Sequence, residues 1–153
     1  MQEGAPFPLL PVRALGVDFG EARIGLALSD ETGTLATPLE TIRRRPGKRP
    51  PFKAMEEVAR RCGVEAIVFG LPLELSGEDS EWSHEVRAVA AKFGERLGLP
   101  VHLVDERMSS VRAERMVRSS GLPLHKREEK GRVDGAAAAI LLQEWLDRRR
   151  RVP

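Results

Sequence analysis

Residues 13–29 read RALGVDFGEARIGLALS, and this stretch predicts two strands joined by a short turn. The apolar segment 13–18 predicts a buried strand that ends in the carboxylate of Asp18, and residues 24–29 predict its neighbour. Asp30-Glu31-Thr32-Gly33 has the residue types of a hairpin turn, so a third strand is expected over about 35–42. The chain therefore begins as an antiparallel meander.

The pattern changes after the Pro-Gly and Pro-Pro pairs of residues 46–51, because helical spacing of apolar residues begins to alternate with short buried strands. Parallel crossovers that follow an antiparallel meander predict an α/β fold, a mixed five-stranded sheet flanked by helices. We expect one domain over residues 12–150 after a flexible tail at 1–11. The later elements are a helix at 52–61, a strand at 65–70, a helix at 82–97, a strand at 101–105, a helix capped by Ser109 or Ser110 and running to about 119, a basic loop at 121–132 and a last helix at 133–149.

The composition excludes several classes of protein. A chain of 153 residues with 41% hydrophobic and 31% charged residues is typical of one globular domain. No apolar run approaches the ~20 residues of a membrane span, and no signal-peptide pattern opens the chain. The single cysteine, Cys62, cannot form an internal disulfide and is expected to be a half-buried thiol on a helix. These features favour a cytoplasmic location.

The basic residues are unevenly distributed, although the formal net charge is only +2. Eight of them fall within residues 43–61, which hold only Glu56 and Glu57 as acids. Further basic groups are the four arginines of 148–151 and the loop residues Lys126, Arg127, Lys130 and Arg132. Such clusters favour a polyanionic partner such as nucleic acid, although the ion-pair surface of a heat-adapted protein would also explain them.

Acidic residues follow the predicted strands at one edge of the sheet. Asp18 ends the first strand, Asp105 and Glu106 end the fifth, and Asp134 lies in the first turn of the last helix. Ligands gather beyond the carboxyl ends of parallel strands, and a carboxylate on a core-facing helix stripe is costly unless a cation neutralises it. Carboxylate oxygens suit Mg²⁺ or Mn²⁺, and a pair of such ions supports phosphodiester cleavage. Alone, Asp18 could be a turn residue and Asp134 a favourable charge at a helix start.

The motif GVDFG at residues 16–20 has a second interpretation. A strand that ends in Asp-x-Gly also opens the phosphate site of the actin-like and sugar-kinase ATPases, where Gly20 would let backbone amides approach a phosphate. Those ATPases hold the nucleotide with a duplicated domain, and 153 residues supply only one. Chain length therefore argues against this interpretation.

Four motifs in this order resemble the YqgF (RuvX) family, whose members are described as Holliday-junction resolvases and as pre-16S rRNA nucleases. The resemblance covers residues 15–146. It is carried by GVDFGEARIG at 16–25, VFGLP at 68–72 with Gly77, VDERMSS at 104–110 with Ala113 and Glu114, and VDGAAAAILL at 133–142.

The resemblance implies an RNase H-like fold in which Asp18, Glu106 and Asp134 are the catalytic, metal-binding triad for Mg²⁺ or Mn²⁺. It also implies that Arg23, Arg107 and Ser109 lie near nucleic acid, and the loop with Lys126, Arg127, Lys130 and Arg132 could clamp its backbone. The fifth strand should lie two places from the first, roughly 10 Å away, which Glu106 could span. In an alternative arrangement Asp105 replaces Glu106 as the ligand while Glu106 pairs with Arg107.

We therefore expect a metal-dependent nuclease acting on nucleic acid, with the 5′ end of pre-16S rRNA ranked before a Holliday junction as substrate. Symmetric junction cleavage needs two sites in a dimer, and the sequence has no evident dimer helix, so we expect a monomer or a weak homodimer. A non-catalytic nucleic-acid-binding module for ribosome assembly is the alternative from another class.

Overall fold

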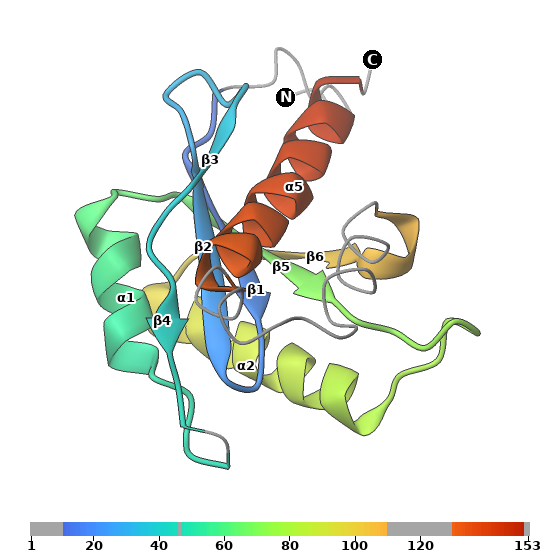
Figure 1. The fold of residues 1–153 in the computed structure, drawn as a ribbon. Helices are drawn as coiled ribbons and strands as arrows, with labels where there is room; N and C mark the ends of the chain where they lie inside the picture. The colour runs from blue at the N-terminus through green and yellow to red at the C-terminus, as the bar shows by residue number, and fades with distance from the viewer. Residues whose placement is uncertain (1–10, 46, 110–129, 152–153) are drawn as a thin grey trace.

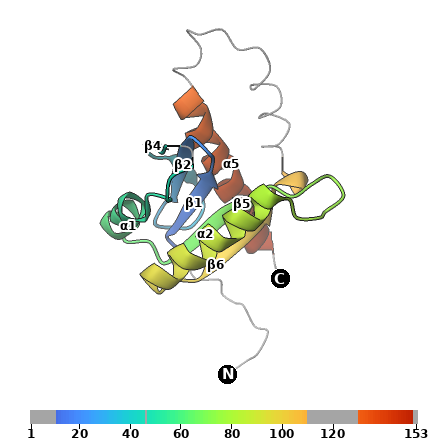
Figure 2. The ribbon, with the colours of Figure 1, turned by 90° about the horizontal axis from the view of Figure 1, so that it is seen from below.

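The computed structural model describes residues 11–45, 47–109 and 130–151, with the description of 108, 130–134 and 151 limited to the backbone. A mixed sheet lies between helices on its two faces (Figures 1 and 2). The elements are β1 (Ala14–Phe19), β2 (Arg23–Ser29), β3 (Ala36–Pro38), β4 (Ile42–Arg43), α1 (Phe52–Arg61), β5 (Ala66–Leu71), α2 (Glu81–Leu97), β6 (Val101–Asp105), the 3₁₀ turn η1 (Glu106–Met108) and α5 (Lys130–Arg151).

The strand order β3-β2-β1-β5-β6 confirms the predicted architecture. β1 pairs antiparallel with β2 and parallel with β5, and β5 pairs parallel with β6. β1, β5 and β6 therefore end at the same edge of the sheet, and β6 lies two places from β1 as expected. We call this the carboxyl edge.

The expected third strand at 35–42 is wrong in one respect, because it is split into β3 and β4. Both segments pair with β2, β3 opposite its end and β4 opposite its start. Pro38 closes β3 because proline has no amide hydrogen for the ladder. Leu39 N donates to Leu26 O at 2.8 Å, so the chain still follows β2 back toward the carboxyl edge.

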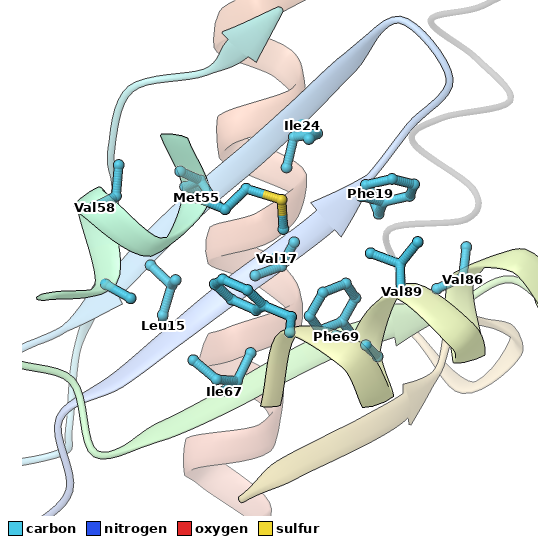
Figure 3. Close-up of a cluster of buried hydrophobic side chains, with 14 of the residues drawn as sticks. Leu15, Val17, Phe19, Ile24, Met55, Val58, Ile67, Phe69, Val86 and Val89 are labelled. Carbon is cyan, nitrogen blue, oxygen red and sulfur yellow. The ribbon is translucent and has the colours of Figure 1, made fainter. Parts of the chain in front are cut away.

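One face of the sheet is covered by α1 and α2 and is packed with large side chains (Figure 3). Alternate residues of β1, Leu15, Val17 and Phe19, point to this face, as strand periodicity requires. Phe69 of β5 meets Phe93 of α2 edge to face, with ring centroids 6.2 Å apart. This core supplies most of the large buried apolar groups among the described residues.

The other face is covered by α5 and is built from small residues. Ala14, Ala27, Ala66 and Val68 point toward the helix, and Gly16 lies among them. A Cβ added to Gly16 would lie 2.9 Å from Cβ of Leu142 and 3.0 Å from the carbonyl oxygen of Ala138, so α5 approaches the strand too closely for any side chain there. Glycine at this position sets the height of α5 above β1.

Helix boundaries differ from expectation mainly at α5. It begins at Lys130 rather than at 133, so Lys130 and Arg132 belong to a helix and not to the expected loop. α2 begins at Glu81, where the side chains of Ser80 and Ser83 form a capping box. The tail at 1–10, the helix expected over 109–119 and Lys126 and Arg127 lie outside the described residues, and the single-domain boundaries stay a prediction. None of the helices in the described ranges has the length and apolar content that crossing a bilayer requires.

Candidate active site at the carboxyl edge

Asp18 lies next to the end of β1, on the face covered by α5. Its neighbours Val17 and Phe19 point to the opposite core, and register places Asp18 beside Gly25 of β2. Its side chain is only 7% exposed. A nearly buried carboxylate is costly unless its charge is compensated, so the position is unusual for a simple turn residue.

Glu106 approaches the carboxyl edge beside Asp18 from β6, which lies on the far side of β5. It follows β6 directly as the first residue of η1, and it is 4% exposed. A Cβ added to Gly70 would lie only 2.7 Å from Oε2 of Glu106, so the carboxylate rests on the backbone of β5. Val17 and Phe69 are paired in register, so the next residues, Asp18 and Gly70, are neighbours on adjacent strands. Glu106 therefore crosses from β6 toward Asp18, and the absence of a side chain at Gly70 makes room for it.

Asp134 lies in α5, in the part described by its backbone alone. It precedes Ala138 by four residues, about 6 Å along the helix axis, and Ala138 packs on Gly16. Gly135 lies near Leu39 and Thr41, which shows that this end of α5 is directed toward the carboxyl edge. Within the described ranges no three His, Cys, Asp or Glu side chains form a metal cluster, and the third member of the expected triad has a side chain outside that description.

Arg107 pairs with Asp105, so the alternative in which Glu106 pairs with Arg107 does not match the geometry. Nη2 of Arg107 lies 2.7 Å from Oδ2 of Asp105, and Nη1 donates to the carbonyl of Leu75 at 3.2 Å. The hydrogen bond that Arg107 donates to Asp105 is the main cause that raises the pKa of Arg107 above its usual value. Arg107 thus fastens the loop before α2 to the end of β6, which leaves Glu106 as the acid directed toward Asp18.

Ser109 forms a hydrogen bond within the protein, and its expected contact with nucleic acid stays a prediction. It is buried, and its hydroxyl donates to the carboxylate of Glu144 in α5. This hydrogen bond joins the end of η1, and with it Glu106, to the helix that covers the site.

Arg23 opens β2, half-buried, on the same face as Asp18. Among the residues that the structure describes, Arg23 forms no ion pair, neither with Glu21 nor with any other acid. A cation on the face of Asp18 that forms no ion pair within the described residues is suited to a substrate phosphate.

Several arginines of the basic run are, by contrast, neutralised within the protein. Glu56 of α1 is 7% exposed and forms ion pairs with Arg96 of α2 and with Arg60, the latter at 3.5 Å. The hydrogen bond from Arg96 is the leading cause that lowers the pKa of Glu56. Arg61 pairs with Glu40 in the same way. The charge of residues 43–61 is therefore not one continuous basic surface.

Sequence reasoning did not identify the contact of Glu106 with Gly70 or the role of Glu144. A glycine inside a strand often marks a close approach of another group, and Gly70 lies inside a strand, so its position in the sequence could have indicated such an approach. Nothing in the sequence linked Glu144 to Ser109, because the two are 35 residues apart and meet only through packing. Trp82 and Trp145 pack against the two cores. Trp82 stacks on Phe19, and the ring of Trp145 lies tilted against His102.

Comparison of the sequence with known proteins identifies relatives of this chain. A protein from Anaeromyxobacter dehalogenans (strain 2CP-C) named "Putative pre-16S rRNA nuclease" is 44% identical over 138 residues, 90% of this chain and 98% of its own length. A protein of the same name from Koribacter versatilis is 43% identical over 137 residues, covering 90% of this chain and 88% of its own length.

Solved structures identify the fold. Thermus thermophilus RuvC in complex with a Holliday junction substrate aligns with a TM-score of 0.56 over 92% of this chain and 97% of its own, at 17% identity. A second structure of Thermus thermophilus RuvC gives a TM-score of 0.54 at 16% identity, with the same coverage. The RNase H-like fold expected from the sequence is confirmed. The model of the family described as "RuvX: Holliday junction resolvase" matches residues 12–148, and the chain belongs to that family.

Proposed function

We propose that this protein is a divalent-metal-dependent nuclease that hydrolyses phosphodiester bonds, acting in the cytoplasm on the 5′ end of pre-16S rRNA. The proposal is supported by the positions of two nearly buried carboxylates at the carboxyl edge: Asp18 lies next to the end of β1, and Glu106 lies over Gly70 of the neighbouring strand. Relatives at 43–44% identity carry the name of such a nuclease and support the choice of substrate.

The donor set fits a hard divalent cation. Asp18 and Glu106 offer carboxylate oxygens, which Mg²⁺ and Mn²⁺ prefer, and His or Cys ligands are absent from this part of the described chain. Asp134 would complete the set from the start of α5. Bound there, the cation would activate water and stabilise the charge that develops on the phosphate.

The residues of the chain hold and orient the reacting groups. Asp18 is fixed by its strand, and Glu106 by the backbone of β5 beneath it and by the neighbouring hydrogen bond of Ser109 to α5. Arg23 stands on the same face and would hold the phosphate that is cut. Arg107 is engaged with Asp105 and the carbonyl of Leu75. It would position the loop beside the site rather than bind the substrate.

The substrate test compares Asp18→Asn and Glu106→Gln with the parent on a pre-16S rRNA 5′-end fragment and on a four-way DNA junction. Each variant should lose at least 100-fold in Mg²⁺- or Mn²⁺-dependent cleavage, because a carboxylate charge is removed from the site. Asp147→Asn is the matched control, since the same change is made at an exposed end of α5 where the acid pairs with Arg150. Unchanged cleavage by Asp18→Asn would contradict the assignment of the site.

The description of the family favours a second substrate, the Holliday junction. Comparing cleavage of the RNA fragment with cleavage of the DNA junction distinguishes the two substrates. Faster cleavage of the junction would favour a resolvase, which requires two sites in a symmetric dimer. A monomer or weak homodimer that cuts the RNA fragment would support the proposed role. Binding of either substrate without cleavage at any Mg²⁺ or Mn²⁺ concentration would instead favour a non-catalytic module.

A further inference from the structure

Two arginines lie directly opposite each other beside the carboxyl edge. Register pairs Arg23 of β2 with Arg43 of β4 in the antiparallel ladder. Cross-strand partners of this kind have Cβ atoms about 4.5–5.5 Å apart on the same face of the sheet, and like charges there are destabilising. The fold therefore places two like-charged residues at adjacent positions on one face of the sheet, which is unfavourable unless an anion lies between them.

Their face of the sheet is the face of Asp18. Ile24 and Ile42 are the next cross-strand pair, and both pack into the opposite core. Strand alternation then directs Arg23 and Arg43 to the side covered by α5, where Asp18 lies beside Gly25. Arg23 and Gly25 are two residues apart on one strand, so the arginine pair flanks the carboxylate.

Within the part of the chain that the structure describes, neither arginine is paired with an acid. Across the described ranges no ion pair involves Arg23 or Arg43, whereas Arg60, Arg61 and Arg96 of the neighbouring helices each contact an acid. Arg43 is exposed and Arg23 is half-buried. Arg23 and Arg43 occupy adjacent positions, and one of them is exposed to water. Such a pair suits bidentate hydrogen bonds from guanidinium groups to phosphate oxygens.

Arg44 holds this arrangement in place. Its backbone amide donates to Ala22 O at 2.9 Å, and its Nη1 donates to Gly20 O at 3.3 Å, so β4 is fastened to the turn that follows Asp18. Its guanidinium also lies over the ring of Phe19, 4.7 Å from the centroid. Arg44 thus faces the large-residue core, and strand alternation places Arg43 on the opposite face.

We propose that Arg23 and Arg43 form a phosphate clamp for the nucleic-acid strand that enters the carboxyl edge, so that β4 is a substrate-binding strand. The inference rests on the proposed nuclease function and adds a backbone contact outside the acidic triad. Phosphate contacts of this kind fix the register of a strand and carry no base specificity.

The test measures binding separately from cleavage. Equilibrium binding of a labelled single-stranded RNA and of a four-way DNA junction is followed against salt concentration in the Asp18→Asn background. Arg43→Ala should weaken binding about five- to ten-fold for any base sequence. It should also reduce the salt slope by about one phosphate contact, roughly 0.7 for the single strand and 0.9 for duplex arms. Arg43→Lys, which keeps the charge, should preserve the slope and lose part of the affinity.

Arg60→Ala is the matched control, because it removes one arginine from the same basic run at a place where Glu56 already neutralises it. It should leave affinity and slope within two-fold of the parent. Equal effects of Arg43→Ala and Arg60→Ala, or no binding by the parent, would overturn the clamp. If the Asp18→Asn parent binds with the expected slopes while the unsubstituted protein never cuts, the result would refute the nuclease and still support the clamp.

Discussion

The two faces of the sheet are formed by the same strands but differ in the size of their side chains and in the environment of their acids. The face under α1 and α2 is filled by large side chains such as Phe69, Phe93 and Met55, and its buried acid, Glu56, is paired with arginines. The face under α5 uses glycine and alanine, so the helix comes close and the carboxylates of Asp18 and Glu106 can be held between layers. Stability is concentrated on the first face and chemistry on the second. Single substitutions can test this division.

The largest stability effect is expected for Phe69→Ala on the large-residue face. Phe69 is fully buried against Phe93, and removal of such a ring leaves a cavity that costs about 3–5 kcal/mol of unfolding free energy. Denaturant unfolding measures the loss. If the variant still folds, cleavage per folded molecule should change little. A small loss of stability would show that the division between the faces is wrong.

Gly70→Ala should affect activity more than stability. The new Cβ would lie 2.7 Å from Oε2 of Glu106 and 2.6 Å from Cδ1 of Leu141, and both are ends of flexible side chains that can move. We expect a loss of about 1 kcal/mol and, because Glu106 is displaced, cleavage slower on the order of 100-fold. Steady-state kinetics and thermal unfolding measure the two effects.

Gly135→Ala is the matched control for that substitution. Its added Cβ would meet Leu39, Pro38 and Thr41 only at 3.5–3.9 Å, which is ordinary contact. An alanine in a helix should then raise the unfolding free energy by about 0.5–1 kcal/mol. Similar behaviour of the two alanine variants would contradict the role of Gly70 as the floor beneath Glu106.

The smallest effect concerns Glu56 and its dependence on pH. Its pKa in the folded protein is lowered, chiefly by the hydrogen bond from Arg96. The pairing therefore stabilises the fold above the ordinary glutamate pKa of 4.5 and is lost as the pH falls through the lower folded value. Glu56→Gln should cost about 1 kcal/mol at pH 7 and less than this at pH 3, with cleavage unchanged. Urea unfolding at both pH values tests the sign, and an equal loss at both would contradict it.

Much of the fold and part of the site could be predicted because they depend on local pattern. Strand periodicity at residues 13–29 placed Asp18 at a strand end, and the order of later elements placed Glu106 at the end of a strand two places away. The split of the third strand and the early start of α5 were missed. Both depend on how the chain pairs and packs rather than on apolar spacing.

The sequence alone determined the order of elements, the family and which acids follow the strands, since all of these depend on residue type and spacing along the chain. Only the tertiary structure decided which side chains meet: Arg107 with Asp105, Ser109 with Glu144, and Glu106 over Gly70. It also set Arg23 opposite Arg43. The physical reason is that strand register and the distance between helix and sheet arise from packing of the whole core, and no local pattern contains them.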